Sequence, residues 1–133
     1  MYVDKLLLLS DEQIICNAAS EYSENVIDLG AAKNLAKGTQ LYVVVVIDVT
    51  IASVTSINFQ VVTDDSATLA GSTVQVESGA ILQASLTANR APIVIPVGSV
   101  LNIKEQYLGV YYVLAGSVNA TGKVTTFVAF DTP

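Results

Sequence analysis

Hydrophobic residues occupy seven consecutive positions, 41–47, and four of them are Val. β-Branched side chains favour strands, and an antiparallel strand with one face in water would alternate polar and apolar residues. The run therefore predicts a strand that is buried on both faces. Burial of this kind requires a second layer of structure against the strand.

Alternating patterns predict two further strands. Over residues 56–63 and again over residues 73–78, apolar and polar residues alternate, which is typical of a half-buried strand. The side chains expected to face the core are Ile57, Phe59 and Val61 in the first segment and Val74 and Val76 in the second.

Residues 107–115 predict a longer strand whose two faces are both apolar or aromatic. One face carries Leu108, Val110, Tyr112 and Leu114, and the other carries Tyr107, Gly109, Tyr111 and Val113. Alternate residues of a strand point to opposite sides. One face is therefore expected to pack on the core and the other against a neighbouring element or subunit.

Turn-forming residues separate these segments at the spacing typical of an all-β sandwich or barrel. Pro96, within the β-type run 93–98, predicts an edge strand or a strand end, because proline cannot donate a hydrogen bond to a neighbouring strand. The length of 133 residues favours one domain over residues 1–133. We expect an all-β, antiparallel β-sandwich.

Composition adds an expectation about partners. Hydrophobic residues make up 52% of the chain and charged residues only 14%, so we expect some apolar surface to be covered by another copy or by a larger partner. The net charge is −6, and the six basic residues are scattered. No basic patch for a phosphate backbone is present, so nucleic-acid binding is not expected.

No targeting or membrane segment is expected. The apolar stretch within residues 1–11 is short, follows an acidic residue and lacks an adjacent small-residue cleavage site, unlike a secretory signal peptide. No run approaches the roughly 20 apolar residues of a membrane span. We therefore expect a chain that stays soluble without export by the standard route.

The chain lacks the usual parts of an active site. It has no His, and Cys16 is its single Cys and is expected to be a small core residue. Adjacent Asp64 and Asp65 allow a calcium site, but turn residues are the favoured interpretation. Paired acids could support glycoside hydrolysis only if they met in space. We expect no enzyme activity, no metal and no cofactor.

Several segments together carry a resemblance that covers most of the chain. They are DKLLLLSDEQ at residues 4–13, VIDLG at 26–30, FQVVTDD at 59–65, YLGVYY at 107–112, Gly116, and GKV at 122–124. In order and spacing they resemble the small capsid cement, or decoration, proteins of tailed bacteriophages, particularly the cement family known from a short-tailed Bordetella phage.

The resemblance implies a jelly-roll-like β-sandwich that forms a small homo-oligomer, a trimer or a dimer. Such a protein is made in the host cytoplasm, binds the outer surface of the capsid and clamps neighbouring major capsid proteins together. No cofactor, nucleic acid or membrane takes part in this role.

Residues 1–13 are a candidate contact arm, because a run of four leucines flanked by charges is hard to satisfy on a free terminus. An ordinary first strand of the sandwich is the alternative. The residues expected to contact another subunit or the capsid are Leu6, Leu7, Leu8, Leu9, Tyr107 and Tyr111.

Two rival functions use the same scaffold, since one fold hosts many functions. The first is a sugar-binding or host-attachment module. The chain has no Trp, and Tyr111 and Tyr112 point to opposite faces of one strand, so these two rings cannot form a single sugar platform. The second is a hydrolase that uses paired acids, with Asp64 and Asp65 as the residues to substitute.

Overall fold

The computed structural model describes residues 5–15, 20–29, 40–97, 105–116 and 121–130. Within them lie two short 3₁₀ helices and nine strands. The helices are η1 (Lys5–Leu7) and η2 (Gln83–Ser85). The strands are β1 (Leu8–Ile14), β2 (Ser20–Tyr22), β3 (Ile27–Asp28), β4 (Leu41–Val49), β5 (Val54–Asp64), β6 (Thr73–Leu82), β7 (Ile93–Val97), β8 (Tyr107–Gly116) and β9 (Lys123–Ala129).

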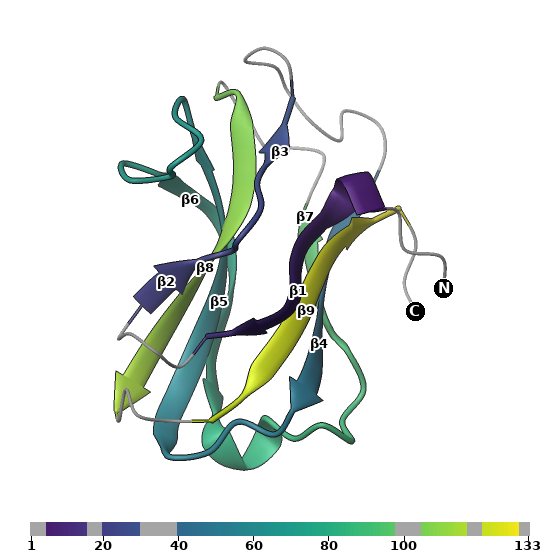
Figure 1. Ribbon diagram of the computed structural model, residues 1–133, viewed down its shortest axis with the longest axis vertical. Helices are drawn as coiled ribbons and strands as arrows, with labels where there is room; N and C mark the ends of the chain where they lie inside the picture. The colour runs from purple at the N-terminus through teal and green to yellow at the C-terminus, as the bar shows by residue number, and fades with distance from the viewer. Residues whose placement is uncertain (1–4, 16–19, 30–39, 98–104, 117–120, 131–133) are drawn as a thin grey trace.

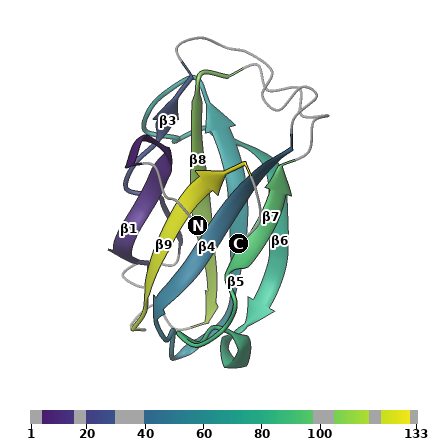
Figure 2. The ribbon, with the colours of Figure 1, turned by 90° about the vertical axis from the view of Figure 1, so that its right-hand side faces the viewer.

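The strands form two sheets that pack face to face (Figure 1). Sheet A has the order β1-β9-β4-β7, which Figure 2 shows from its outward side. Sheet B has the order β2-β8-β5-β6, and β3 also pairs with β8. All of these pairings are antiparallel. The expected all-β antiparallel sandwich is confirmed.

The strand order is that of a jelly roll. β2 and β3 pair with successive parts of β8, so together they act as one interrupted strand. Counting them once leaves eight strands in two four-stranded sheets, and sequence neighbours lie in opposite sheets except for β5 and β6, which pair within sheet B. The connection between β2 and β3 therefore lies along one side of the sandwich, beside β1.

β4 is buried on both faces, as its hydrophobic run predicts. Val43 and Val45 face the core between the sheets, and Val44 on the outward side is also fully buried. Val44 lies opposite Phe127 of β9 and forms an outward cluster with it and Ala129. The outward face of sheet A thus carries an apolar cluster of its own.

The alternating pattern of β5 is confirmed, but that of β6 fails at one residue. Ile57, Phe59 and Val61 are fully buried in the core, and Val76 packs against it. Val74 pairs with Val62 on the outward side and is 46% exposed. The pairing shifts by one residue between Val61–Val76 and Val62–Val74, which is a β-bulge, and the extra residue in β6 turns Val74 to the face opposite that of Val76.

The remaining strand predictions agree with the structure. In β8, Leu108, Val110, Tyr112 and Leu114 all belong to the core, so Tyr107, Gly109, Tyr111 and Val113 face outward. Pro96 lies in β7, which is an edge strand of sheet A and, among the described strands, pairs only with β4. Its missing N–H therefore faces no neighbouring strand. Cys16 lies outside the described residues.

A chain of buried hydroxyls joins the two sheets through the core. Ser10 of β1 and Thr126 of β9 pair across sheet A, and both lie within 2.8 Å of the Tyr112 hydroxyl of β8. Ser10 donates its proton to the side-chain carbonyl of Gln13. Each hydroxyl has one proton, so Tyr112 must donate to Ser10 and Thr126 to Tyr112. Burial raises the pKa of the Tyr112 phenol, which keeps it protonated.

The carboxyl group of Glu21 points into the sandwich, and within the described part of the chain no hydrogen bond offsets the desolvation of one of its oxygens. Glu21 of β2 pairs with inward-facing Tyr112, and its Oε1 atom is buried with no hydrogen-bond partner among the residues that the structure describes. Burial raises the pKa of Glu21 above its ordinary value of 4.5, because desolvation disfavours the charged form. At neutral pH the charged Glu21 therefore weakens the fold.

We expect Glu21→Gln to raise the free energy of unfolding at pH 7, because an amide has no charge to desolvate. The raised pKa means that the folded state holds its proton more tightly than the unfolded chain, so wild-type stability falls as pH rises from about 4.5 through the folded pKa. Urea unfolding at pH 7 and pH 4 should show a gain that shrinks in acid. Glu12→Gln, at an exposed position, is the control. An equal gain at both pH values would contradict the assignment.

Candidate docking site

The four leucines of the N-terminal run have different environments. Leu6 in η1 is 84% exposed, and Leu8 is half-buried. Leu9 is fully buried, and Leu7 packs against the core. Leu9 therefore lies in the core and Leu7 packs against it, which leaves Leu6 and Leu8 as the more accessible of the four predicted contact residues.

The arm expected at residues 1–13 is a strand over most of its described length. β1 begins at Leu8 and pairs with β9 at the edge of sheet A. A bulge after Leu8 turns both Leu9 and Ser10 toward the core. Residues 8–13 therefore form the first strand of the sandwich, and their contact with a partner stays a prediction.

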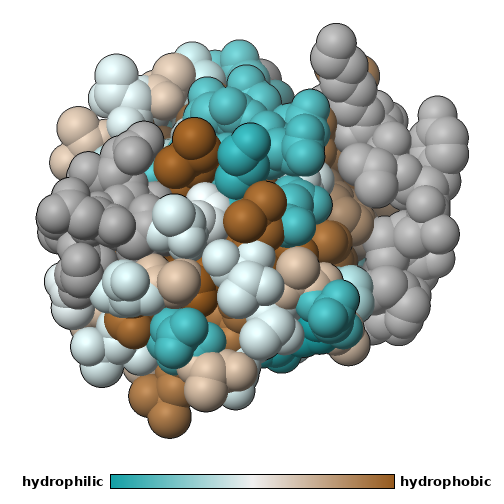
Figure 3. All heavy atoms as spheres, turned by 60° about the horizontal axis from the view of Figure 1, so that its bottom comes forward, coloured by the Kyte–Doolittle hydropathy of each residue, from teal (hydrophilic) through white to brown (hydrophobic). Residues whose placement is uncertain are grey.

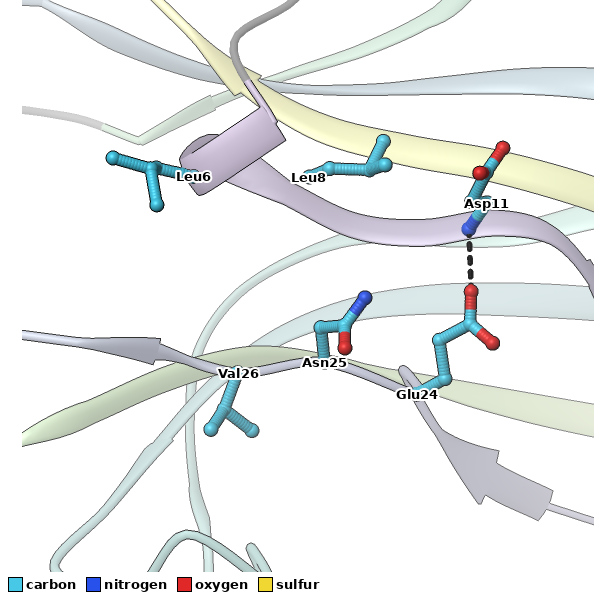
Figure 4. Close-up of a pocket in the computed structure, with 6 residues that line it drawn as sticks. All are labelled: Leu6, Leu8, Asp11, Glu24, Asn25 and Val26. Carbon is cyan, nitrogen blue, oxygen red and sulfur yellow. Dashed lines mark hydrogen bonds between the residues drawn. The ribbon is translucent and has the colours of Figure 1, made fainter.

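A groove of about 530 Å³ lies between β1 and the β2–β3 connection (Figure 4). Leu6, Leu8 and Asp11 come from one wall, and Glu24, Asn25 and Val26 come from the other. In Figure 4 the side chains of Glu24 and Asn25 extend toward β1. The jelly-roll topology creates this groove, because it places β1, at the edge of sheet A, beside the β2–β3 connection at the edge of sheet B.

Hydrogen bonds fix the two walls of the groove to each other. The backbone N–H of Asn25 donates to the Leu9 carbonyl at 2.9 Å, and the N–H of Asp11 donates to Glu24 Oε1 at 2.7 Å. Gln13 connects both walls, since its amide donates to the Tyr22 carbonyl and its Oε1 accepts from the N–H of Glu24. The same Oε1 accepts from Ser10, so the buried hydroxyl chain ends at the groove.

The groove combines apolar and acidic groups. Leu6, Leu8 and Val26 supply apolar surface at one end, and the exposed carboxylates of Asp11 and Glu24 lie at the other. This arrangement suits a partner segment with an apolar side chain next to Lys or Arg, because charge complementarity orients the segment while apolar burial stabilises it.

The two tyrosines predicted as contacts lie elsewhere, on the outward side of β8. Tyr111 packs edge-on against Tyr22, with ring centroids 4.3 Å apart and ring planes at 69°. Tyr107 lies farther along the same face and pairs with Asp28 of β3. Neither residue lines the groove, so the six predicted contact residues do not form one site.

The acidic residues that could have formed a reactive pair have separate structural partners. Asp64 accepts hydrogen bonds from the N–H groups of Asp65 and Gly71 and so closes the β5–β6 loop. Glu77 accepts from the side chains of Asn58 and Gln60. In the described part of the chain, no three His, Cys, Asp or Glu residues are grouped to hold a metal ion. Likewise, none of the described helices could span a membrane.

The end of the molecule formed around η2 does not resemble a contact surface. Figure 3 shows that end with hydrophobic residues lying singly or in small groups among hydrophilic ones on its described surface. Scattered apolar residues of this kind are normal on soluble proteins. The groove is therefore the better candidate for docking.

Asp11 lies within the predicted contact arm at residues 1–13, but sequence reasoning missed the residues of the other wall: Glu24, Asn25 and Val26. No sequence signal marks them, because they meet only when β1 and the β2–β3 connection are brought together from different sheets. The run of leucines was a usable signal, but only the strand and its bulge show which of them are exposed.

The family model Bbp16 matches residues 9–128, which span all nine strands apart from one residue at each end. The family name derives from a Bordetella phage. No curated protein matches the chain in sequence.

Proposed function

We propose that this chain, which belongs to the Bbp16 family, is a viral structural protein that binds the outer surface of a phage capsid and stabilises it by clamping neighbouring major capsid proteins. Its place is then the virion, after synthesis in the host cytoplasm. The family match over residues 9–128 carries the proposal, and the cement-protein resemblance of the sequence supports it. The role requires no catalytic group, metal or cofactor.

The groove supports this role as a docking site for the capsid. Its walls are braced by hydrogen bonds before any partner binds, which lowers the entropic cost of association. A modest contact is sufficient for a cement protein, because the capsid lattice repeats it many times and links the contacts through each oligomer.

Self-association is part of the proposal, as a dimer or a trimer. On the outward face of sheet A, Tyr42 and Val46 are only partly buried beside the cluster of Val44, Phe127 and Ala129, which is itself buried. These partly exposed side chains supply the apolar surface for contact with a second copy. Light scattering of the purified protein should give a mass above that of one chain, and a strictly monomeric protein would contradict this part.

Leu6→Asp tests the docking site. We expect it to lower occupancy on purified capsids about tenfold or more, because it places a charge at the end of the groove that offers apolar contact. Co-sedimentation with capsids of the phage that encodes the chain measures the occupancy. A point substitution is preferable to deleting residues 1–9, because Leu9 belongs to the core and Leu7 packs against it.

Leu82→Asp is the matched control. Leu82 is also an exposed leucine, at 64%, but it ends β6 and lies outside the groove. Both variants should fold, since each changes an exposed side chain. Unchanged occupancy for Leu6→Asp, or an equal loss for Leu82→Asp, would exclude the groove as the capsid contact. Absence of wild-type binding to any capsid form would refute the function itself.

A further inference from the structure

A second hollow, of about 180 Å³, lies on the outward face of sheet B. It shares no lining residue with the docking groove. Its lining residues are Tyr22, Gln60, Val62, Ser72, Val74 and Tyr111. They come from four strands and the β5–β6 loop, so only the folded sheet assembles them.

Two tyrosines form a corner of the hollow. Tyr22 of β2 pairs directly with Tyr111 of β8, so both rings lie on the same outward face. The two rings make an edge-to-face contact with their planes at 69°, and both residues line the hollow. Tyr111 and Tyr112 could not form such a site within one strand, and the neighbouring strand supplies the second ring instead.

Polar groups line the hollow and its border. Gln60 uses its amide N–H to donate to Glu77 Oε2, which leaves its side-chain carbonyl as an acceptor. Asn58 donates to the same carboxylate oxygen, so Glu77 is held beside Gln60 with its second oxygen outside these two bonds. Ser72 adds a hydroxyl to the lining. Aromatic surface thus lies beside hydroxyl, amide and carboxylate groups.

The wall formed by the β5–β6 loop is fixed in advance. Leu69 is 1% exposed and covers the sheet at Gly109, where an added Cβ would lie only 2.5 Å from the Leu69 side chain. The N–H of Ser72 donates to the Leu69 carbonyl, and Asp64 holds Gly71. A wall that is already ordered reduces the entropy lost when a ligand binds.

We propose that this hollow binds a single neutral pyranose ring at the end of a glycan. Sugar C–H groups pack on aromatic faces, and sugar hydroxyls pair with amide, hydroxyl and carboxylate groups. The volume of about 180 Å³ is below the roughly 300–1,000 Å³ typical of pockets for drug-sized ligands, so it suits one sugar ring. Glu77 and the net charge of −6 disfavour anionic sugars.

This inference goes beyond the capsid role and assigns Tyr111 to a ligand site instead of a capsid contact. Saturation-transfer difference NMR tests it, with maltose, lactose and cellobiose as neutral probes and sialyllactose as the acidic comparison. We expect saturation transfer to a terminal ring of at least one neutral disaccharide and weaker transfer to sialyllactose.

Tyr111→Ala should weaken binding about tenfold or more, since it removes half of the aromatic corner. Tyr107→Ala is the matched control, because Tyr107 shares the strand and its face but lies outside the hollow. Gln60→Ala gives a second test at a position outside the core, and it should also weaken binding. Melting temperatures of all three variants show whether they fold.

Several outcomes would overturn the inference. Saturation transfer to none of the neutral probes would do so, as would binding of sialyllactose as strong as that of the neutral sugars. An equal loss of sugar binding in Tyr111→Ala and Tyr107→Ala, or unchanged sugar binding in Gln60→Ala, would also contradict it. If Tyr111→Ala lost capsid occupancy while the wild type bound no sugar, the hollow would be a protein contact. Capsid occupancy that is unchanged in Tyr111→Ala, together with lost sugar binding, supports two independent surfaces.

Discussion

Replacing Tyr112 with Phe is expected to lower the free energy of unfolding by about 2–4 kcal/mol, because two buried hydroxyls each lose a partner at roughly 1–3 kcal/mol apiece. Ser10 loses its donor, and Thr126 loses its acceptor. Both residues are fully buried, so water cannot replace the phenol. Urea unfolding measures the loss, which should also appear as a melting temperature lower by about 10 °C.

Removing the partners as well should recover much of this loss. In Tyr112→Phe combined with Ser10→Ala and Thr126→Val, no buried hydroxyl is left unpaired, and apolar groups of similar shape take their place. Full additivity of the three substitutions would contradict the hydrogen-bond chain, because members of one network should couple.

Alkaline pH offers an independent measurement of the same group. The folded state raises the pKa of Tyr112 and keeps its proton, whereas the unfolded chain releases it near the ordinary value of 10. Wild-type stability should therefore fall as pH rises above about 10. Part of that fall should be absent in Tyr112→Phe, which has no proton at this position.

Gly116→Ala is expected to cost about 2–4 kcal/mol of stability, because it combines backbone strain with a steric clash. Gly116 has φ of +97°, a conformation that residues with a Cβ rarely adopt. An added Cβ would lie 2.7 Å from the backbone nitrogen of Thr55. The register of β5 and β8 shifts at this point, so the backbones approach each other closely.

Gly71→Ala is the control for this substitution. Gly71 has nothing within 4 Å of an added Cβ, and its N–H bond to Asp64 would be retained. Thermal unfolding of the two variants should therefore give a large decrease for Gly116→Ala and little change for Gly71→Ala. Similar melting temperatures would show that the β5–β8 contact tolerates a side chain.

The sequence pattern and the tertiary structure each contributed to locating the candidate site. The leucine run pointed to the correct region, but alternation alone could not assign Leu6 and Leu8 to the surface and Leu7 and Leu9 to the core. The η1 turn and the bulge in β1 decide that division. Val74 shows the same effect in β6, where one extra residue places a predicted core side chain on the outer face.

The sequence by itself determined the all-β sandwich, the buried β4, the core faces of β5 and β8 and the edge position of Pro96, because periodicity and proline chemistry are local properties. Only the tertiary structure decided which distant residues meet. Tyr22 beside Tyr111, Glu24 beside Asp11, and Tyr112 between Ser10 and Thr126 all join different strands or sheets. Strand pairing and bulges fix these contacts, and a local hydrophobic pattern contains neither.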